Sequence, residues 1–271
     1  MTQHLLLTRM NVVTPFGSPL ACLDRDWLAH RFALFDRYTF PSVMAQTGAA
    51  PFTWVLFSHP DTPPEFKERL LARARECPSL YVEWRAEFDG VSARQAVAKM
   101  LRPETRLVIT SRVDNDDAIG RTFMAAVQAE AATASLDRGG SFINFDLGYH
   151  LHAGKVYRAE HQSNPFCSVV EERETFRGVY GVMHEHQESL YPVVHVRRRR
   201  RWLTIIHDRN ASNTVDGTRC PSNALRAEFT WLPADDVVPY GWLASQTRRA
   251  RSAARLVATR LKQAIPRRNQ E

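Results

Sequence analysis

The chain has 271 residues, 44% of them hydrophobic, and a formal net charge of +7 at pH 7. This length allows one large domain or two small ones, and the sequence contains no run of about eighteen apolar residues, which argues against a membrane-spanning helix. The N-terminus lacks the basic start and cleavage site of a signal peptide. Four scattered cysteines without a CxxC pair predict neither a zinc site nor a disulfide framework. We therefore expect a cytoplasmic protein with reduced cysteines.

Strand and helix patterns alternate through the first two-thirds of the chain. Apolar runs predict strands at 5–7, 52–57, 80–84 and 106–113. Helical spacing or first-turn prolines predict helices at 24–38, 41–46, 63–71 and 92–101. This alternation is typical of α/β layering with a largely parallel sheet.

The pattern changes after Gly139 and Gly140. A strand is predicted at 141–145, a hairpin at 149–158 that turns at Ala153-Gly154, and further strands at 175–183, 193–196 and 202–207. This half is expected to be antiparallel or mixed. We expect one domain over residues 1–215, a C-terminal extension over 216–246 and a basic amphipathic helix with its tail over 247–271.

The positive charge is concentrated at the C-terminus. Residues 245–271 contain eight basic residues and one acid, Glu271, so their net charge of +7 equals that of the whole chain and residues 1–244 are formally neutral. The predicted helix has a mostly alanine face opposite a basic face, which favours weak contact with anionic lipid. We therefore expect peripheral contact at the inner membrane face through 247–271. A neutral body makes nucleic acid a less suitable partner.

Three carboxylates, Asp114, Asp116 and Asp117, follow the strand predicted at 106–113, and a helix is predicted to begin at Ala118. Carboxylates this close repel one another, and a divalent cation offsets the repulsion. Mg²⁺ and Mn²⁺ prefer oxygen ligands, including those of a diphosphate. The alternative is a helix N-cap, but one aspartate suffices for a cap. The sequence therefore predicts a metal site in which Asp116 is the main ligand.

Other side chains are predicted at the same edge of the sheet. His207 follows an apolar strand and can add a neutral nitrogen ligand to the metal. Arg9, Arg94 and Arg112 fall at strand ends or helix starts, and guanidinium groups suit a diphosphate. In an open α/β sheet, ligands bind at the carboxyl ends of the strands.

Several of these segments resemble GT-A-type glycosyltransferases, and in particular a bacterial rhamnosyltransferase group. The resemblance covers roughly residues 5 to 215, and it is carried by 41–47 (PSVMAQT), 92–97 (SARQAV), 110–119 (TSRVDNDDAI), 164–166 (NPF) and 202–213 (WLTIIHDRNASN). It implies a GT-A-like, Rossmann-like mixed sheet with flanking helices. It also implies metal-dependent transfer of a sugar, rhamnose by the family label, from a nucleotide-diphosphate donor to a glycan, lipid or small acceptor.

The same resemblance implies a late metal-binding histidine, for which His207 is the best match, and a downstream acid as general base. Glu171 or Glu172 and Glu185 are the candidates for that base, and the residues do not choose between them. Many GT-A enzymes carry an acidic pair after the second strand to hold the nucleotide base, whereas this chain has only Asp61 there.

Two other functions use the same features. A metal-dependent phosphohydrolase would use the acids but needs a nucleophile or a second metal cluster, and neither is evident. A nucleic-acid-binding protein would use the C-terminal charge and the run Arg197–Arg201, which lacks interleaved aromatic residues apart from Trp202.

Overall fold

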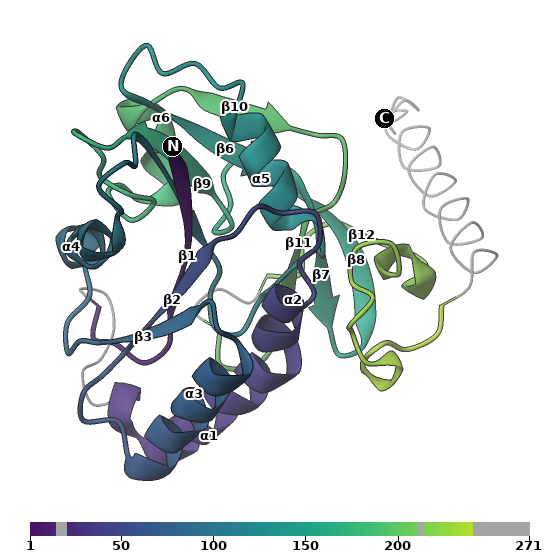
Figure 1. Cartoon of the computed structure of the whole chain (residues 1–271). Helices are drawn as coiled ribbons and strands as arrows, with labels where there is room; N and C mark the ends of the chain where they lie inside the picture. The colour runs from purple at the N-terminus through teal and green to yellow at the C-terminus, as the bar shows by residue number, and fades with distance from the viewer. Residues whose placement is uncertain (15–20, 211–213, 241–271) are drawn as a thin grey trace, which may run out of the picture.

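The computed structural model describes residues 1–14, 21–210 and 214–240, and its main layer is a seven-stranded sheet (Figure 1). The strand order is β10-β6-β9-β4-β1-β2-β3. Only β9 runs antiparallel to its neighbours. The strands are β1 (Thr2–Arg9), β2 (Thr53–Ser58), β3 (Leu80–Trp84), β4 (Leu107–Arg112), β6 (Gly140–Phe145), β9 (Ser168–Glu172) and β10 (Val193–Val196). The predicted α/β class with a largely parallel sheet is confirmed.

Side chains alternate between the two faces of this sheet, and helices cover both faces. In β1, Leu6 belongs to one core cluster, whereas Leu5 and Leu7 belong to the other. The first face packs against α1 (Arg25–Leu34), α2 (Phe40–Met44), α3 (Pro64–Glu76) and α5 (Phe123–Ala131), and the second against α4 (Gly90–Met100). A π-helical turn, Phe35–Thr39, joins α1 to α2. The helices predicted from spacing and prolines in the first 101 residues are thus confirmed.

The order in which strands are added to the sheet switches sides at β1. The chain passes from β1 to β2 and β3 on one side, and then returns to place β4 on the other side of β1. The carboxyl ends of β1 and β4 therefore flank a point where the strand order switches. In open α/β sheets, such a point leaves a crevice for ligands.

A second sheet has the order β12-β8-β7-β11-β5. The predicted hairpin is confirmed as β7 (Leu147–His152) and β8 (Lys155–Glu160), and the predicted strand at 202–207 as β11 (Trp202–Ile206). Ala153 and Gly154 at the turn both have positive φ. The short strand β12 (Thr218–Arg219) pairs with β8, so residues beyond the expected boundary at 215 join this sheet. The helix and tail expected at 247–271 lie outside the described residues.

Two local predictions were wrong. No helix begins at Ala118, because Ala118–Ile119 forms strand β5, which pairs antiparallel with Leu203 and Trp202, and α5 begins only at Phe123. The segment 175–183 contains turns instead of a strand. His184–His186, directly after this segment, forms a 3-10 helix.

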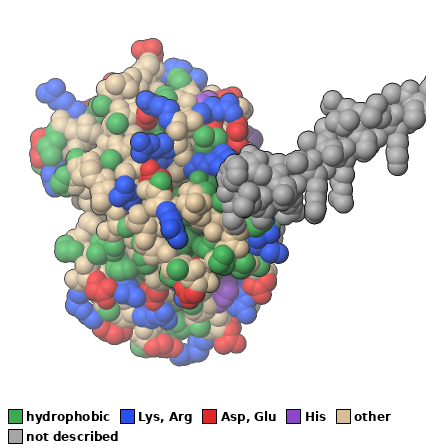
Figure 2. All heavy atoms as spheres, turned by 90° about the vertical axis from the view of Figure 1, so that its right-hand side faces the viewer, with side chains coloured by type: hydrophobic (Ala, Val, Ile, Leu, Met, Phe, Trp, Pro, Cys, Tyr) green, Lys and Arg blue, Asp and Glu red, His purple; other side chains and the backbone are tan. Residues whose placement is uncertain are grey.

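The arginine run 197–201 is largely neutralised. Arg197 pairs with Glu160, Arg198 pairs with Glu130, and Arg199 and Arg201 both approach Glu228. Arg200 donates to two backbone carbonyls. Figure 2 shows basic and acidic side chains interspersed on one face of the molecule. This pairing removes the run as a free polyanion-binding patch. None of the helices within the described ranges is both long and apolar enough to cross a bilayer.

Candidate active site

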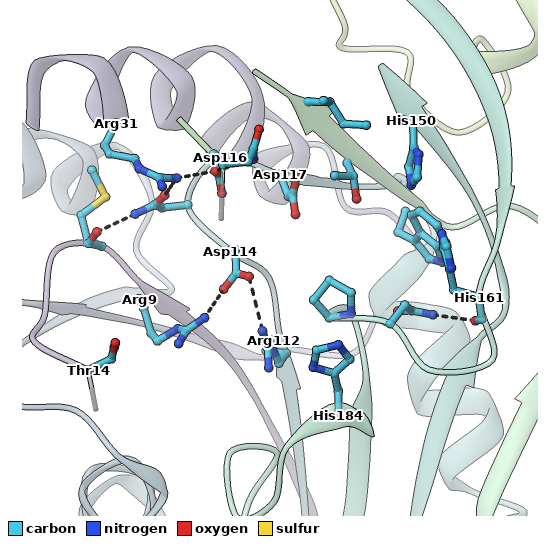
Figure 3. A pocket seen from close by; sticks show the side chains of 18 of the residues that line it. Arg9, Thr14, Arg31, Arg112, Asp114, Asp116, Asp117, His150, His161 and His184 are labelled. Atoms are coloured by element: carbon cyan, nitrogen blue, oxygen red, sulfur yellow. Dashed lines mark hydrogen bonds and ion pairs between the residues drawn. The ribbon is translucent and has the colours of Figure 1, made fainter. Parts of the chain in front are cut away.

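A cavity of about 870 Å³ opens at the carboxyl ends of β1 and β4. Of the residues proposed from sequence, Arg9, Arg112, Asp114, Asp116, Asp117 and Glu185 line it. Figure 3 shows Arg9 and Arg112 directed at Asp114, and Arg31 reaching Asp116 from another side. The fold therefore brings together the acids and most of the basic residues expected at this edge.

Asp114 holds two guanidinium groups. Its Oδ1 lies 3.0 Å from Arg9 Nη2, and its Oδ2 lies 3.3 Å from Arg112 Nη2. Burial would raise the pKa of Asp114, but the charges of Arg9 and Arg112 outweigh burial and hold it well below its usual range. Asp114 is therefore ionised, and both of its oxygens are already engaged.

Tyr180, which the sequence analysis did not single out, packs against the same two arginines. Its ring centroid lies 5.4 Å from Arg9 Cζ and 5.1 Å from Arg112 Cζ. Such cation–π contacts hold a guanidinium group in place. Tyr180 belongs to the segment predicted as a strand, and no pattern in the sequence marks it as a neighbour of residues 9 and 112.

Asp116 contacts a different set of groups. Arg31, from α1, forms a short ion pair with Asp116 Oδ2 and also lies 3.3 Å from Asn115 Oδ1. His207 Nε2 lies 3.0 Å from Asp116 Oδ2, and Asn210 donates to the same oxygen. The sequence analysis missed Arg31, which sits on the helix predicted at 24–38 without a motif of its own.

Asp117 is the most constrained of the three acids. Its Oδ1 accepts a hydrogen bond from the backbone N–H of Ile205 at 3.0 Å, and its backbone carbonyl accepts one from Thr39. Burial and the neighbouring carboxylates of Asp116 and Asp114 raise the pKa of Asp117 well above its usual range. A cation at this corner would relieve that repulsion.

His207 lies against Asp116 but does not line the cavity. On its other side, Nδ1 lies 3.4 Å from His30 Nε2 on α1. His207 is thus placed behind Asp116 as seen from the cavity. Its expected role as a metal ligand in the cavity stays a prediction.

The two acids proposed as general base occupy different environments. Glu185 lines the cavity with a half-exposed side chain, and its Oε1 lies 3.1 Å from His184 Nε2. Glu171 is 0% exposed on β9 and accepts hydrogen bonds from the backbone N–H groups of Arg177 and Gly178 at 2.8 and 2.9 Å. The structure therefore corrects the assignment of Glu171, which anchors a turn and cannot reach a substrate.

Two residues proposed to bind the nucleotide lie elsewhere. Arg94 is exposed on α4 and does not line the cavity. Asp61 follows β2, but its side chain is 79% exposed and does not line the cavity. Arg94 lies on α4, and α4 covers the opposite face of the sheet from α1. Its position near the start of a helix therefore does not bring it to the cavity.

A histidine pair lies at the other end of the cavity and was not predicted. The rings of His150 and His161 stack with centroids 5.6 Å apart (Figure 3). Burial, followed by the charge of His161, lowers the pKa of His150 to about 4, so its ring is neutral at pH 7. At this end the neutral ring of His150 lies beside Asp216, whereas Arg9 and Arg112 line the end near Asp114.

Comparison with solved structures finds partial similarities. S. aureus TarS matches with a TM-score of 0.44 and 10% identity over 75% of this chain and 37% of that chain. S. aureus TarS 1-349 in complex with UDP matches with a TM-score of 0.42 and 13% identity over 76% of this chain and 61% of that one. A "putative nucleotide-diphospho-sugar transferase" from Desulfovibrio desulfuricans G20 matches with a TM-score of 0.39 and 11% identity, over 85% of this chain and 93% of that one. The chain thus spans 37% and 61% of these two TarS chains, less than two thirds of either.

No curated protein matches the sequence. A family model described as "Putative rhamnosyl transferase" matches residues 20–219, which include the acids after β4, Glu185 and β11. The match spans well over half of the chain and most of the described cavity. By this match, the chain belongs to the rhamnosyl transferase family.

Proposed function

We propose that the protein is a glycosyltransferase that moves a sugar from a nucleotide-diphosphate donor to an acceptor hydroxyl. The observation that carries this proposal is the pairing of two arginines, Arg9 and Arg112, with the single carboxylate of Asp114 at the cavity. Because two guanidinium groups share one carboxylate, the group formed by Arg9, Arg112 and Asp114 has a net positive charge. Both arginines line the cavity, and the side chain of Arg9 is 31% exposed. Diphosphate oxygens match such guanidinium donors in charge and geometry.

A divalent cation, Mn²⁺ or Mg²⁺, fits beside these arginines. Asp116 and Asp117 would hold it, because both line the cavity, and burial together with the neighbouring carboxylates raises the pKa of Asp117. Asp114 would position the arginines instead of acting as a main ligand. When bound, the cation would stabilise the charge that develops on the departing diphosphate. Arg31, already paired with Asp116, would balance the charge of this carboxylate.

Glu185 is our candidate for the general base. A base must reach the acceptor hydroxyl, and Glu185 lines the cavity beside His184. Burial and the charge of Arg112 lower the pKa of His184, so a neutral imidazole can orient the carboxylate. Glu185 would take the proton of the hydroxyl while the acceptor oxygen attacks the sugar.

The family description suggests rhamnose as the donor sugar. The acceptor would be a glycan, a lipid-linked molecule or a small molecule, bound toward the end of the cavity near His150 and His161. We further propose a cytoplasmic location with peripheral contact at the inner membrane face, for which the charge of residues 245–271 is the support.

Calorimetric titration of nucleoside diphosphates tests the proposal. Binding of UDP, dTDP or GDP should require Mn²⁺ or Mg²⁺, and Asp116→Asn should lose most of that affinity while keeping the fold. Asp61→Asn is the matched control, because this carboxylate is exposed outside the cavity. Equal affinity in the presence of EDTA would contradict the role of the metal, and no binding of any nucleoside diphosphate would contradict the function.

The donor is then identified by thermal shift. Nucleotide sugars with different bases and sugars are compared with and without Mn²⁺, and a sugar-dependent shift identifies the donor. Release of inorganic phosphate without sugar transfer would indicate a phosphohydrolase instead.

A further inference from the structure

A second cluster of potential metal ligands lies outside the cavity. His30 on α1 and His207 and Asp208 directly after β11 offer ligand atoms that all lie within 4.8 Å of one another. We call these three residues the outer histidine site. None of them lines the cavity, so this cluster differs from the acids that face the donor.

The spacing of the two imidazoles suits a shared metal ion. His30 Nε2 lies 3.4 Å from His207 Nδ1, and the ring planes meet at 68°. For tetrahedral zinc with Zn–N bonds of about 2.0–2.1 Å, two nitrogen ligands lie about 3.3–3.4 Å apart. As a direct hydrogen bond the same contact is long. The two rings are thus held at the distance a metal requires, without a strong interaction between them.

Asp116 fixes the orientation of His207. Its carboxylate can only accept, so His207 Nε2, at 3.0 Å, carries the proton and donates it. The lone pair of Nδ1 then points toward His30. The backbone N–H of Arg209 also approaches this nitrogen, at 3.2 Å, which agrees with Nδ1 as an acceptor and is the contact a metal would replace. A carboxylate that holds a metal-binding histidine by its second nitrogen is a common outer-shell arrangement.

The donor set selects a class of metal. Two imidazoles and one carboxylate suit zinc, cobalt and nickel, whereas Mg²⁺ prefers oxygen ligands and retains its water. The exposed carboxylate of Asp208 leaves room for water as a further ligand. The positive charges of Arg31 and Arg209 act on His30, and the negative charge of Asp208 opposes them.

We propose that His30, His207 and Asp208 bind one transition-metal ion of the zinc class, with Asp116 as the outer-shell partner of His207. This ion would fasten the segment after β11 to α1. It is separate from the Mn²⁺ or Mg²⁺ proposed for the diphosphate. The inference does not depend on the glycosyltransferase assignment.

The test uses the full chain without a polyhistidine tag, treated with chelator and then titrated with Zn²⁺ or Co²⁺ by calorimetry. One equivalent should bind, and bound Co²⁺ should give the visible absorption of a low-coordinate nitrogen–oxygen site. His30→Ala and Asp208→Ala should each lose most of this affinity. Asp116→Asn should lower it roughly 10–100-fold, as expected for an outer-shell partner. His186→Ala, an exposed histidine outside the cluster, is the control and should bind as the wild type does.

Circular dichroism and thermal melts establish that each variant is folded. His30→Ala should keep its Mg²⁺-dependent binding of nucleoside diphosphate, so that loss of the outer histidine site and loss of donor binding are separate readouts. Absence of Zn²⁺ and Co²⁺ binding in the wild type would overturn the proposal. Unchanged affinity in the folded His30→Ala variant would overturn it equally.

Discussion

Replacement of Asp114 by asparagine should destabilise the fold, because this carboxylate holds two arginines. Breaking a buried ion pair by removing one partner costs about 3–5 kcal/mol. Here the side chains of Asp114 and Arg9 are 26% and 31% exposed, whereas that of Arg112 is 9% exposed. Solvent screening and relief of the repulsion with Asp117 reduce the expected loss to about 2–3 kcal/mol. In a chain of this size, the loss lowers Tm by about 5–10 °C.

The loss should depend on pH in a defined direction. The pKa of Asp114 is lower in the folded protein than in the unfolded chain. The carboxylate therefore contributes stability that is complete above the unfolded pKa of about 3.9 and declines as pH falls toward the folded value. The difference between wild type and Asp114→Asn should be constant from about pH 5 to 8 and should shrink below about pH 4.

An anion should restore part of the lost stability. In Asp114→Asn, Arg9 and Arg112 lack their carboxylate, so pyrophosphate without metal should stabilise the variant more than the wild type. Urea denaturation and thermal melts with and without pyrophosphate measure this, and Asp61→Asn is the control. If Asp114 were chiefly a metal ligand, pyrophosphate alone would leave the gap unchanged. A gap that pyrophosphate leaves unchanged would contradict the role of Asp114 as the partner of the two arginines. An unfolding free energy of Asp114→Asn within about 0.5 kcal/mol of the wild type would contradict it equally.

Three further predictions concern other parts of the chain. Glu185→Gln should lower kcat about 10²–10⁴-fold with little change in stability, as expected for loss of a general base. Glu171→Ala should instead leave one buried and one partly buried N–H group unpaired and cost about 2–5 kcal/mol of unfolding free energy. Gly148→Ala would place its Cβ 2.0–2.2 Å from three ring atoms of the fully buried Trp202, and overpacking of this kind should destabilise the protein by about 1–3 kcal/mol or more. Removal of residues 245–271 should abolish salt-sensitive flotation with anionic liposomes, since each basic side chain contributes about 1 kcal/mol near an anionic surface.

Each of these has its own check. Steady-state kinetics with the identified donor, together with urea melts, separate Glu185 from Glu171, and a stable but inactive Glu171→Ala would contradict the turn-anchoring role. Urea melts test Gly148→Ala, for which wild-type stability would be the contrary result. The truncated protein should still bind nucleoside diphosphate with Mn²⁺. Tight binding of RNA or DNA at physiological salt by the intact chain, without liposome binding, would favour a nucleic-acid partner.

The sequence by itself determined the elements and the position of the acids. Apolar runs and first-turn prolines located β1 to β4 and the helices between them, because these signals depend on neighbouring residues. Asp114, Asp116 and Asp117 were expected at a strand end, and that is where they lie. The local prediction failed at Ala118, where pairing with β11, a strand more than eighty residues later in the chain, overrode the helical pattern.

The tertiary structure decided which side chains meet. Arg9 and Asp114 are separated by 105 positions, and Arg31 and Asp116 by 85, so no local pattern could pair them. Burial, which depends on what packs over a residue, separated Glu171 from Glu185. Helix α1 brings Arg31 and His30 to the acids, and neither carries a motif. The sequence could supply the charges of the site, but only the packed chain fixes their partners.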